Sequence, residues 1–251
     1  MRITETTPKI FMGYVFSLLM GICLTACTEQ IDEAKVTQVV PSLPISTITV
    51  LKQAALAMPD SYSADAAKDI LQKGGNAVDA AIAAQFVLAV TLPEAGNIGG
   101  GGFMVYRKNN GEIGALDYRE KAPLAASKDM YLDADKNVIK GKSTLGSMAV
   151  GIPGTVAGVF ETHRKFGSLP MKDILQPVIA LAKRGVIVTK KQATRIKSYQ
   201  ARFLSVNKDS ILFDKNWQEN DTIKYNALAA TLTRIQKNGS DEFTKVKRQK
   251  N

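Results

Sequence analysis

The chain has 251 residues, of which 45% are hydrophobic and 22% charged, and its formal net charge is +10. This is the composition of a globular protein long enough for one large domain or two small ones. Outside a cluster at 245–250 the basic residues are scattered, without interleaved aromatics or zinc-ligand spacing, so we expect no nucleic-acid partner. The single histidine, His163, excludes a multi-histidine metal site and a histidine-based triad, and we expect no metal or cofactor.

The N-terminal segment is typical of an exported protein. An apolar run at 10–23 is too short to span a bilayer and suits the core of a signal peptide. It ends in Leu24-Thr25-Ala26-Cys27, which resembles the lipobox of bacterial lipoproteins and implies a lipid on Cys27. We therefore expect a lipoprotein signal peptide at 1–26, a tether at 27–51 and a lipid anchor in the membrane at the cell envelope, on the periplasmic side or the cell surface. The alternative is an ordinary signal peptide with incidental cysteines.

A pair of glycines separates the first two predicted helices. Ser63 is placed to cap the first helix, and Gly74-Gly75 ends it. Asn76 then caps a second helix from Ala77 to about Val90, which is apolar almost all round. Because this helix is too short to span a bilayer, we expect it to be buried at the centre of the fold.

Five glycines lie among the seven residues 96–102, between the apolar helix and a strand-like run. Ile98 stands where a dinucleotide-binding loop requires glycine, and the order helix, loop, strand is also wrong for one. Lys136 stands where a phosphate loop ending in Gly141-Lys142-Ser143 requires glycine. A linker would be polar, whereas apolar segments flank this one. Two interpretations remain, a purely structural corner and a corner that also shapes a substrate pocket.

A β-hairpin is predicted after this glycine corner (96–102). The runs Phe103–Arg107 and Ile113–Tyr118 favour strands, and Asn109-Asn110-Gly111 is a hairpin-turn signal. Arg119 then lies at the end of the second strand, beside the glycine corner. Its planar guanidinium suits a carboxylate ligand, and the alternative is an ordinary surface ion pair.

Helices account for most of the remaining chain. They are expected at 155–165, at 171–183 with Pro177 kinking or dividing the helix, after a cap at Thr189, and at 225–237. Helices, a hairpin and helices again indicate an α+β fold rather than regular βαβ alternation.

Four ordered motifs resemble the γ-glutamyltranspeptidase family. They are Gly74-Gly75-Asn76-Ala77-Val78-Asp79-Ala80-Ala81, Pro93-Glu94-Ala95-Gly96-Asn97-Ile98-Gly99-Gly100-Gly101-Gly102-Phe103-Met104, Asp117-Tyr118-Arg119-Glu120 with Ala122-Pro123, and Gly151-x-Pro153-Gly154-Thr155-Val156-Ala157-Gly158. The resemblance identifies 52–243 as similar to the family's large subunit, and leaves 244–251 as a divergent basic tail.

The resemblance implies a four-layer αββα fold of the N-terminal nucleophile hydrolase type, present here only in its large-subunit part. In the family, a precursor cleaves itself into two subunits, and strands of the small subunit complete the sheets. The new N-terminal threonine of the small subunit attacks the γ-glutamyl amide of glutathione or a related donor, with its own amine as base. The role of binding the donor's α-carboxylate falls on Arg119.

The family's nucleophile lies in a Thr-Thr-His-Phe/Tyr-like sequence, and the near match here is Glu161-Thr162-His163-Arg164. This stretch is expected inside a helix, with His163 either solvated or on the helix surface, so we expect no catalytic residue in this chain. The ending at Asn251 suggests a truncated or frameshifted gene, or a split gene. We expect either a donor-binding large-subunit fragment, active only with a separate small subunit, or a non-catalytic lipoprotein remnant or amino-acid-ligand binding module.

Overall fold

The computed structural model describes residues 54–245. The signal peptide expected at 1–26, Cys27, the tether and the last residues of the basic tail, 246–251, lie outside the described part and stay predictions. The described elements are α2 (Ser61–Gln72), α3 (Ala77–Thr91), β1 (Phe103–Arg107), β2 (Ile113–Asp117), η2 (Ser147–Ala149), α4 (Thr155–Phe166), α5 (Met171–Arg184), β3 (Val186–Ile187), α6 (Lys190–Val206), η3 (Leu212–Asp214), β4 (Thr222–Ile223), α7 (Asn226–Asn238) and α8 (Asp241–Thr244).

The predicted start of the first helix was wrong. Asp60, not Ser63, is the N-cap of α2, because the Asp60 carboxylate accepts a hydrogen bond from the Ser63 amide at 2.8 Å. Ser63 is fully buried inside the first turn, and its hydroxyl donates to the Asp60 carbonyl. The second helix begins as predicted, since Asn76 forms a capping box with Asp79 at the start of α3.

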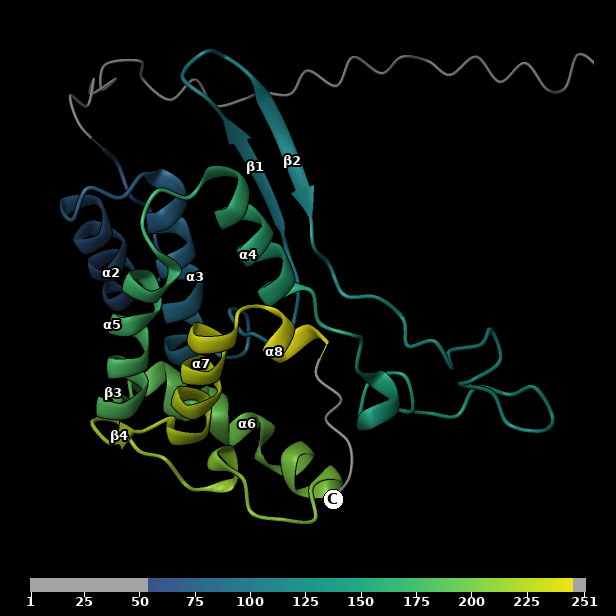
Figure 1. The fold of residues 1–251 in the computed structure, drawn as a ribbon. Helices are drawn as coiled ribbons and strands as arrows, with labels where there is room; N and C mark the ends of the chain where they lie inside the picture. Colours follow the sequence, from purple (N-terminus) through teal and green to yellow (C-terminus); the bar gives the residue numbers. More distant parts are fainter. Residues whose placement is uncertain (1–53, 246–251) are drawn as a thin grey trace, which may run out of the picture. The chain divides into compact units, whose positions relative to one another are not determined.

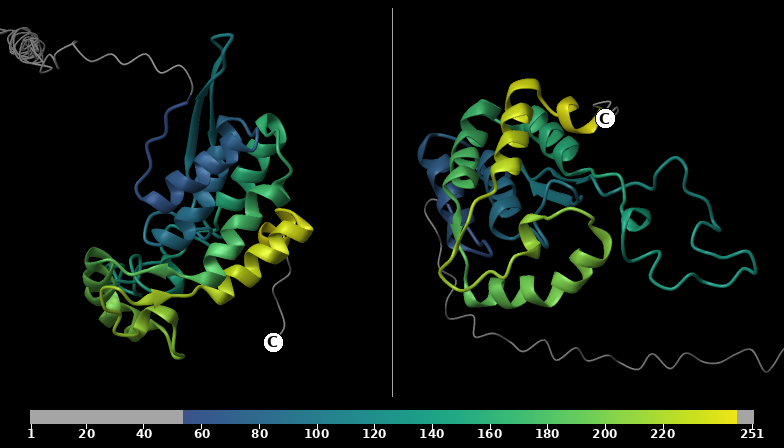
Figure 2. Two further views of the ribbon diagram at one scale, coloured as in Figure 1. Left: turned by 90° about the vertical axis from the view of Figure 1, so that its left-hand side faces the viewer. Right: turned by 90° about the horizontal axis from the view of Figure 1, so that it is seen from below.

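Helix α3 lies at the centre of the hydrophobic core, which confirms the sequence prediction. Phe86, Val87 and Val90 are at most 1% exposed, and α3 contacts α2, α4 and α5. Figures 1 and 2 show α2, α3, α5 and α7 side by side as a helical layer. Helix α5 runs through Pro177 as one helix, so of the two effects expected at this proline, a kink or a division, the division does not occur.

The described strands form two antiparallel pairs, β1 with β2 and β3 with β4. In the hairpin Phe103 pairs with Asp117 and Arg107 with Ile113, so the mixed α+β architecture is confirmed. One face of this hairpin is exposed and apolar: Phe103, Val105 and Ile113 are 63%, 77% and 67% exposed. We call these three side chains the outer hairpin face.

The chain between β2 and α4 projects away from the helical layer (Figures 1 and 2). Reciprocal backbone hydrogen bonds of 3.0 and 2.8 Å between Lys121 and Ile152 close its base. None of the helices described within 54–245 has the length and apolarity that a bilayer crossing requires.

Candidate functional site

The glycine corner lies against the end of β2, as predicted. Gly102 and Tyr118 exchange two backbone hydrogen bonds, of 3.4 and 3.0 Å. A Cβ atom at Gly101 would come within 2.7 Å of the Arg119 Cα and 2.8 Å of the Glu120 nitrogen. Only glycine permits this approach, so the corner fixes the backbone that carries Arg119.

The N-terminus of α4 closes the site from a third direction. The amides of Gly154 and Thr155 both donate to the Gly100 carbonyl, at 2.8 and 3.1 Å. A Cβ atom at Gly154 would overlap the Tyr118 carbonyl oxygen. Three of the motifs singled out in the sequence therefore meet around the backbone of Tyr118 and Arg119.

The packing of Tyr118 at this site was not anticipated from the sequence. Its half-buried ring lies against Gly158 of α4 and Gly102 of the corner, where added Cβ atoms would collide with ring atoms. Burial raises the pKa of the Tyr118 phenol, which keeps it neutral. The available signal was the pair Gly154 and Gly158, which lie four residues apart and so on one helix face.

Arg119 directs its charge into solvent. Its amide donates to the Asp117 carboxylate at 2.9 Å, and its guanidinium lies 5.7 Å from the centre of the Phe103 ring. The Arg119 side chain is 64% exposed, and its Nε lies 3.9 Å from a carboxylate oxygen of Glu120. These neighbouring side chains can approach each other because β2 ends at Asp117, so the alternation of side chains along a strand does not apply to them. A long, exposed pair of this kind contributes little, so a ligand carboxylate can displace it.

A groove of about 510 Å³ lies between α3 and the hairpin. Ala81 and Gln85 of α3, Met104 of β1 and Val159 of α4 line it, together with Tyr118. Tyr118 therefore links this groove to the exposed guanidinium of the next residue.

The near match to the nucleophile motif is structural. Thr162 is only 5% exposed inside α4. His163, predicted to be solvated or on the helix surface, is half-buried, and its Nε2 lies 2.7 Å from the Leu169 carbonyl oxygen. The histidine thus bridges α4 and the turn into α5, a contact that no local pattern reveals.

Asp79 is a second group whose role the sequence did not show. Its fully buried carboxylate accepts hydrogen bonds from the amides of Asn76, Ser168 and Leu169 and from the Ser168 hydroxyl. Burial alone would raise the pKa of Asp79, but these donors outweigh it and hold the pKa below the usual value. In residues 54–245 no three His, Cys, Asp or Glu side chains gather as a metal site.

Solved structures define the class of fold. Gamma-glutamyltranspeptidase from Helicobacter pylori matches with a TM-score of 0.75 and 40% identity over 78% of this chain and 58% of that one. The Pseudomonas nitroreducens gamma-glutamyltranspeptidase complexed with L-DON matches with a TM-score of 0.73 and 45% identity, over 77% of this chain and 57% of that one. The mixed helix-and-strand architecture is thus part of an N-terminal nucleophile hydrolase fold.

The family follows from the sequence comparisons. A family model for Gamma-glutamyltranspeptidase matches residues 63–245. The Glutathione hydrolase proenzyme of Pseudomonas aeruginosa is 47% identical over 191 residues, which are 76% of this chain and 34% of that protein. The chain belongs to the γ-glutamyltranspeptidase family. It spans about a third of the length of the curated relatives it matches.

Proposed function

We propose that this chain is the large-subunit portion of a γ-glutamyl transferase or glutathione hydrolase. It binds the γ-glutamyl donor, glutathione or a related compound, and does not supply the attacking threonine. Arg119 receives the donor's α-carboxylate in a two-pronged contact. The observation that carries this proposal is the convergence of the glycine corner, the end of β2 and the start of α4 on the Arg119 backbone.

The geometry supports a chain that binds the donor without supplying the nucleophile. The backbone of Arg119 is fixed on three sides while its side chain remains exposed, which suits a residue that must reach a bound anion in a constant position. Thr162 lies within the regular hydrogen bonds of α4, so the peptide bond before it is a poor site for self-cleavage. Thr162 is therefore unsuited to be the nucleophile, and we assign that role to a threonine of the small subunit.

In the assembled enzyme the threonine hydroxyl oxygen forms a bond to the γ-glutamyl carbonyl carbon, and its own amine takes the hydroxyl proton. The amide bond to the leaving amine then breaks, and that amine accepts the proton. Water, an amino acid or a peptide finally removes the glutamyl group from the threonine. Arg119 takes no part in these proton transfers, because its role is to hold the far end of the donor.

The test is release of p-nitroaniline from γ-glutamyl-p-nitroanilide by the purified chain, alone and mixed with the small subunit of the Pseudomonas aeruginosa relative. We expect turnover only in the mixture. Turnover by the chain alone would overturn the proposed absence of a nucleophile. No turnover in a mixture that forms a complex would favour a non-catalytic lipoprotein or an amino-acid-ligand binding module.

The residue assignment is tested with Arg119→Lys in the active mixture. Lysine keeps the positive charge but cannot make the two-pronged contact of a guanidinium with a carboxylate. We therefore expect a rise in KM of about tenfold with a small change in kcat. Arg107→Lys is the matched control at the other end of the hairpin, and its KM should not change. An unchanged KM for Arg119→Lys would remove this residue from the donor site.

We also propose that Cys27 carries a lipid and that 27–51 tethers the folded region to the membrane at the cell envelope. The support is the lipobox-like sequence and its apolar leader. Labelling of producing cells with an alkyne fatty acid should mark the wild-type chain and not Cys27→Ser. Equal labelling of both, or none, would leave an ordinary signal peptide as the explanation.

A further inference from the structure

A second cavity, remote in sequence from Arg119, lies between η3 and the start of α7 and measures about 490 Å³. Its apolar wall includes Ile211, Leu212 and Leu228. Lys215 and Lys224 also belong to its lining. A volume of this size suits a small organic ligand.

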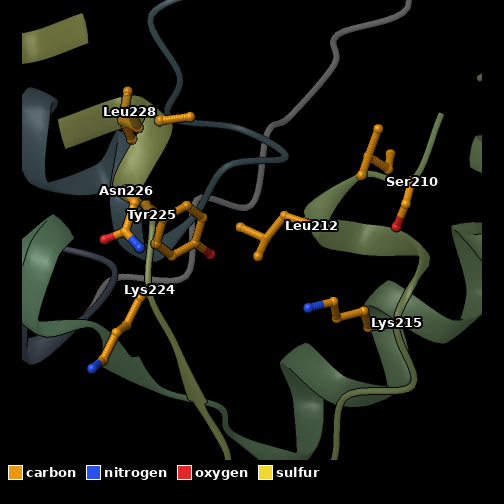
Figure 3. Close-up of a pocket in the computed structure, with 9 residues that line it drawn as sticks. Ser210, Leu212, Lys215, Lys224, Tyr225, Asn226 and Leu228 are labelled. Atoms are coloured by element: carbon orange, nitrogen blue, oxygen red, sulfur yellow. The ribbon is translucent and has the colours of Figure 1, made fainter. Parts of the chain in front are cut away.

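The hydroxyl of Tyr225 is the unusual group in this cavity. The Tyr225 side chain is only 8% exposed, and among residues 54–245 no hydrogen bond to its hydroxyl is formed. Figure 3 shows this hydroxyl and the ammonium of Lys215 directed into the space between η3 and α7, whereas the ammonium of Lys224 is directed away. Most of Tyr225 is buried while its hydroxyl reaches the cavity, so this hydroxyl is available to donate to an acceptor on a ligand there.

The start of α7 adds further donors at the same place. Asn226, Ala227 and Leu228 line the cavity as the first residues of the helix, and within the described part of the chain their amides make no hydrogen bond. No side chain caps this helix, and its first turn holds no acidic residue. Free amides and the positive end of the helix dipole both favour an anion.

The carboxylate of Glu94 opposes the positive charge of the groups at this cavity. Burial, with a smaller contribution from the negative charge of Glu94, raises the pKa of Tyr225 to about 12, so the phenol stays a hydrogen-bond donor at neutral pH. Glu94 lines a neighbouring cavity that also contains Arg195. Removing the Glu94 charge should therefore strengthen anion binding near Tyr225.

From the donors and the apolar wall together, we infer that this cavity binds a small organic carboxylate with an apolar body. The carboxylate accepts hydrogen bonds from the Tyr225 hydroxyl, the Lys215 ammonium and the first amides of α7. The apolar part packs on Ile211, Leu212 and Leu228. This site is independent of the donor site at Arg119 and does not rest on the proposed function.

The probe is N-acetyl-L-leucine, with N-acetyl-L-leucinamide as its uncharged counterpart. Each is titrated into the full-length chain labelled with ¹⁵N, and amide shifts are followed by NMR. We expect the acid to bind at least tenfold more tightly than the amide, with the largest shifts at Ala227 and Leu228. Tyr225→Phe and Lys215→Gln should each weaken binding of the acid roughly tenfold, because each removes a hydrogen bond to a charged group. Glu94→Gln should tighten it.

Tyr62→Phe is the matched control, since Tyr62 is a partly buried tyrosine of α2 at the core. The affinity of this variant for N-acetyl-L-leucine should match that of the wild type. Lys215 is exposed, so its substitution tests the site even if Tyr225→Phe perturbs folding. Equal binding of acid and amide would overturn the inference, as would no shift at the start of α7 or no effect of either substitution.

Discussion

Gly158 faces the ring of Tyr118 so closely that a methyl group at position 158 would overlap the tyrosine Cβ and Cγ atoms. Tyr118 is also held by two backbone hydrogen bonds to Gly102. Helix α4 and the glycine corner thus both hold the residue directly before Arg119. The direction in which the guanidinium leaves the backbone depends on this contact.

Gly158→Ala is predicted to lower stability and to disturb donor binding together. Alanine favours a helix by up to about 1 kcal/mol over glycine, but overpacking a filled site costs about 1–3 kcal/mol. The Tyr118 backbone is fixed on both sides, so the ring cannot retreat and the net loss should be about 1–2 kcal/mol. We expect a lower Tm and, in the active mixture, a KM for γ-glutamyl-p-nitroanilide raised several-fold.

The control for this substitution is Gly75→Ala in the turn between α2 and α3. A Cβ there would lie 2.7 Å from Ile70 and 2.9 Å from Leu169, so it crowds the core at a site away from Arg119. We expect a comparable fall in Tm and an unchanged KM. If both variants raise KM in proportion to their loss of stability, Gly158 has no specific positioning role.

Asp79→Asn is predicted to lower the free energy of unfolding by about 2–3 kcal/mol at neutral pH, because an amide replaces an acceptor of charge-assisted hydrogen bonds. The pKa of Asp79 is lowered in the folded chain from a usual value of 3.8. Its contribution is therefore fully present above pH 3.8 and is lost as the pH falls through the lower folded pKa. Urea unfolding from pH 6 to pH 2 should show the two proteins converging at the acid end. A constant gap would contradict the lowered pKa.

Two buried threonines should respond oppositely to valine. The Thr155 hydroxyl is buried without a partner in the described structure, whereas the Thr91 hydroxyl donates to the Asp60 carboxylate at 2.8 Å. Thr155→Val removes an unsatisfied polar group and should leave stability unchanged or raise it. Thr91→Val should cost about 1–3 kcal/mol, because it removes one of the two donors to the Asp60 carboxylate, the other being the Ser63 amide. Differential scanning calorimetry distinguishes these results, and a large loss for Thr155→Val would reveal an undetected partner.

The outer hairpin face should promote self-association of the isolated chain, since exposed apolar strands pair with one another. The double variant Val105→Thr with Ile113→Thr keeps β-branched residues but reduces apolar surface. We expect sedimentation velocity to show more monomer, with stability changed by no more than about 0.5 kcal/mol. Leu116→Thr, on the other face, should lower stability without changing association. Unchanged association in the double variant would show that another surface is responsible.

Local chemistry made much of this fold predictable. Asn76 as a helix cap, the turn at Gly111 and the close approach at Gly101 each follow from what one residue type does to its own backbone. The wrong prediction of Ser63 as the helix cap also concerns local chemistry. Asp60 and Ser63 are both good capping residues, and the sequence alone did not rank them.

The missed parts of the site depend on contacts between distant segments. The ring of Tyr118 against α4 and the hydrogen bond from His163 to the turn before α5 leave no periodic pattern in the sequence. The direction of Arg119 could not be inferred either, because it depends on where β2 ends. Only the glycines at 154 and 158 pointed toward a close approach, and they did not say to what.

The start of α3 has a consequence for the order in which the chain folds. The Asp79 carboxylate bonds to Ser168, 89 residues away, and the Asn76 side chain donates to the Phe166 carbonyl, 90 residues away. During synthesis the N-terminus of α3 therefore lacks these hydrogen bonds until α4 and the following turn have left the ribosome. We expect closure of this long loop and completion of the helix N-terminus to be coupled, so that the region folds once Ser168 is available rather than stepwise from its N-terminal end.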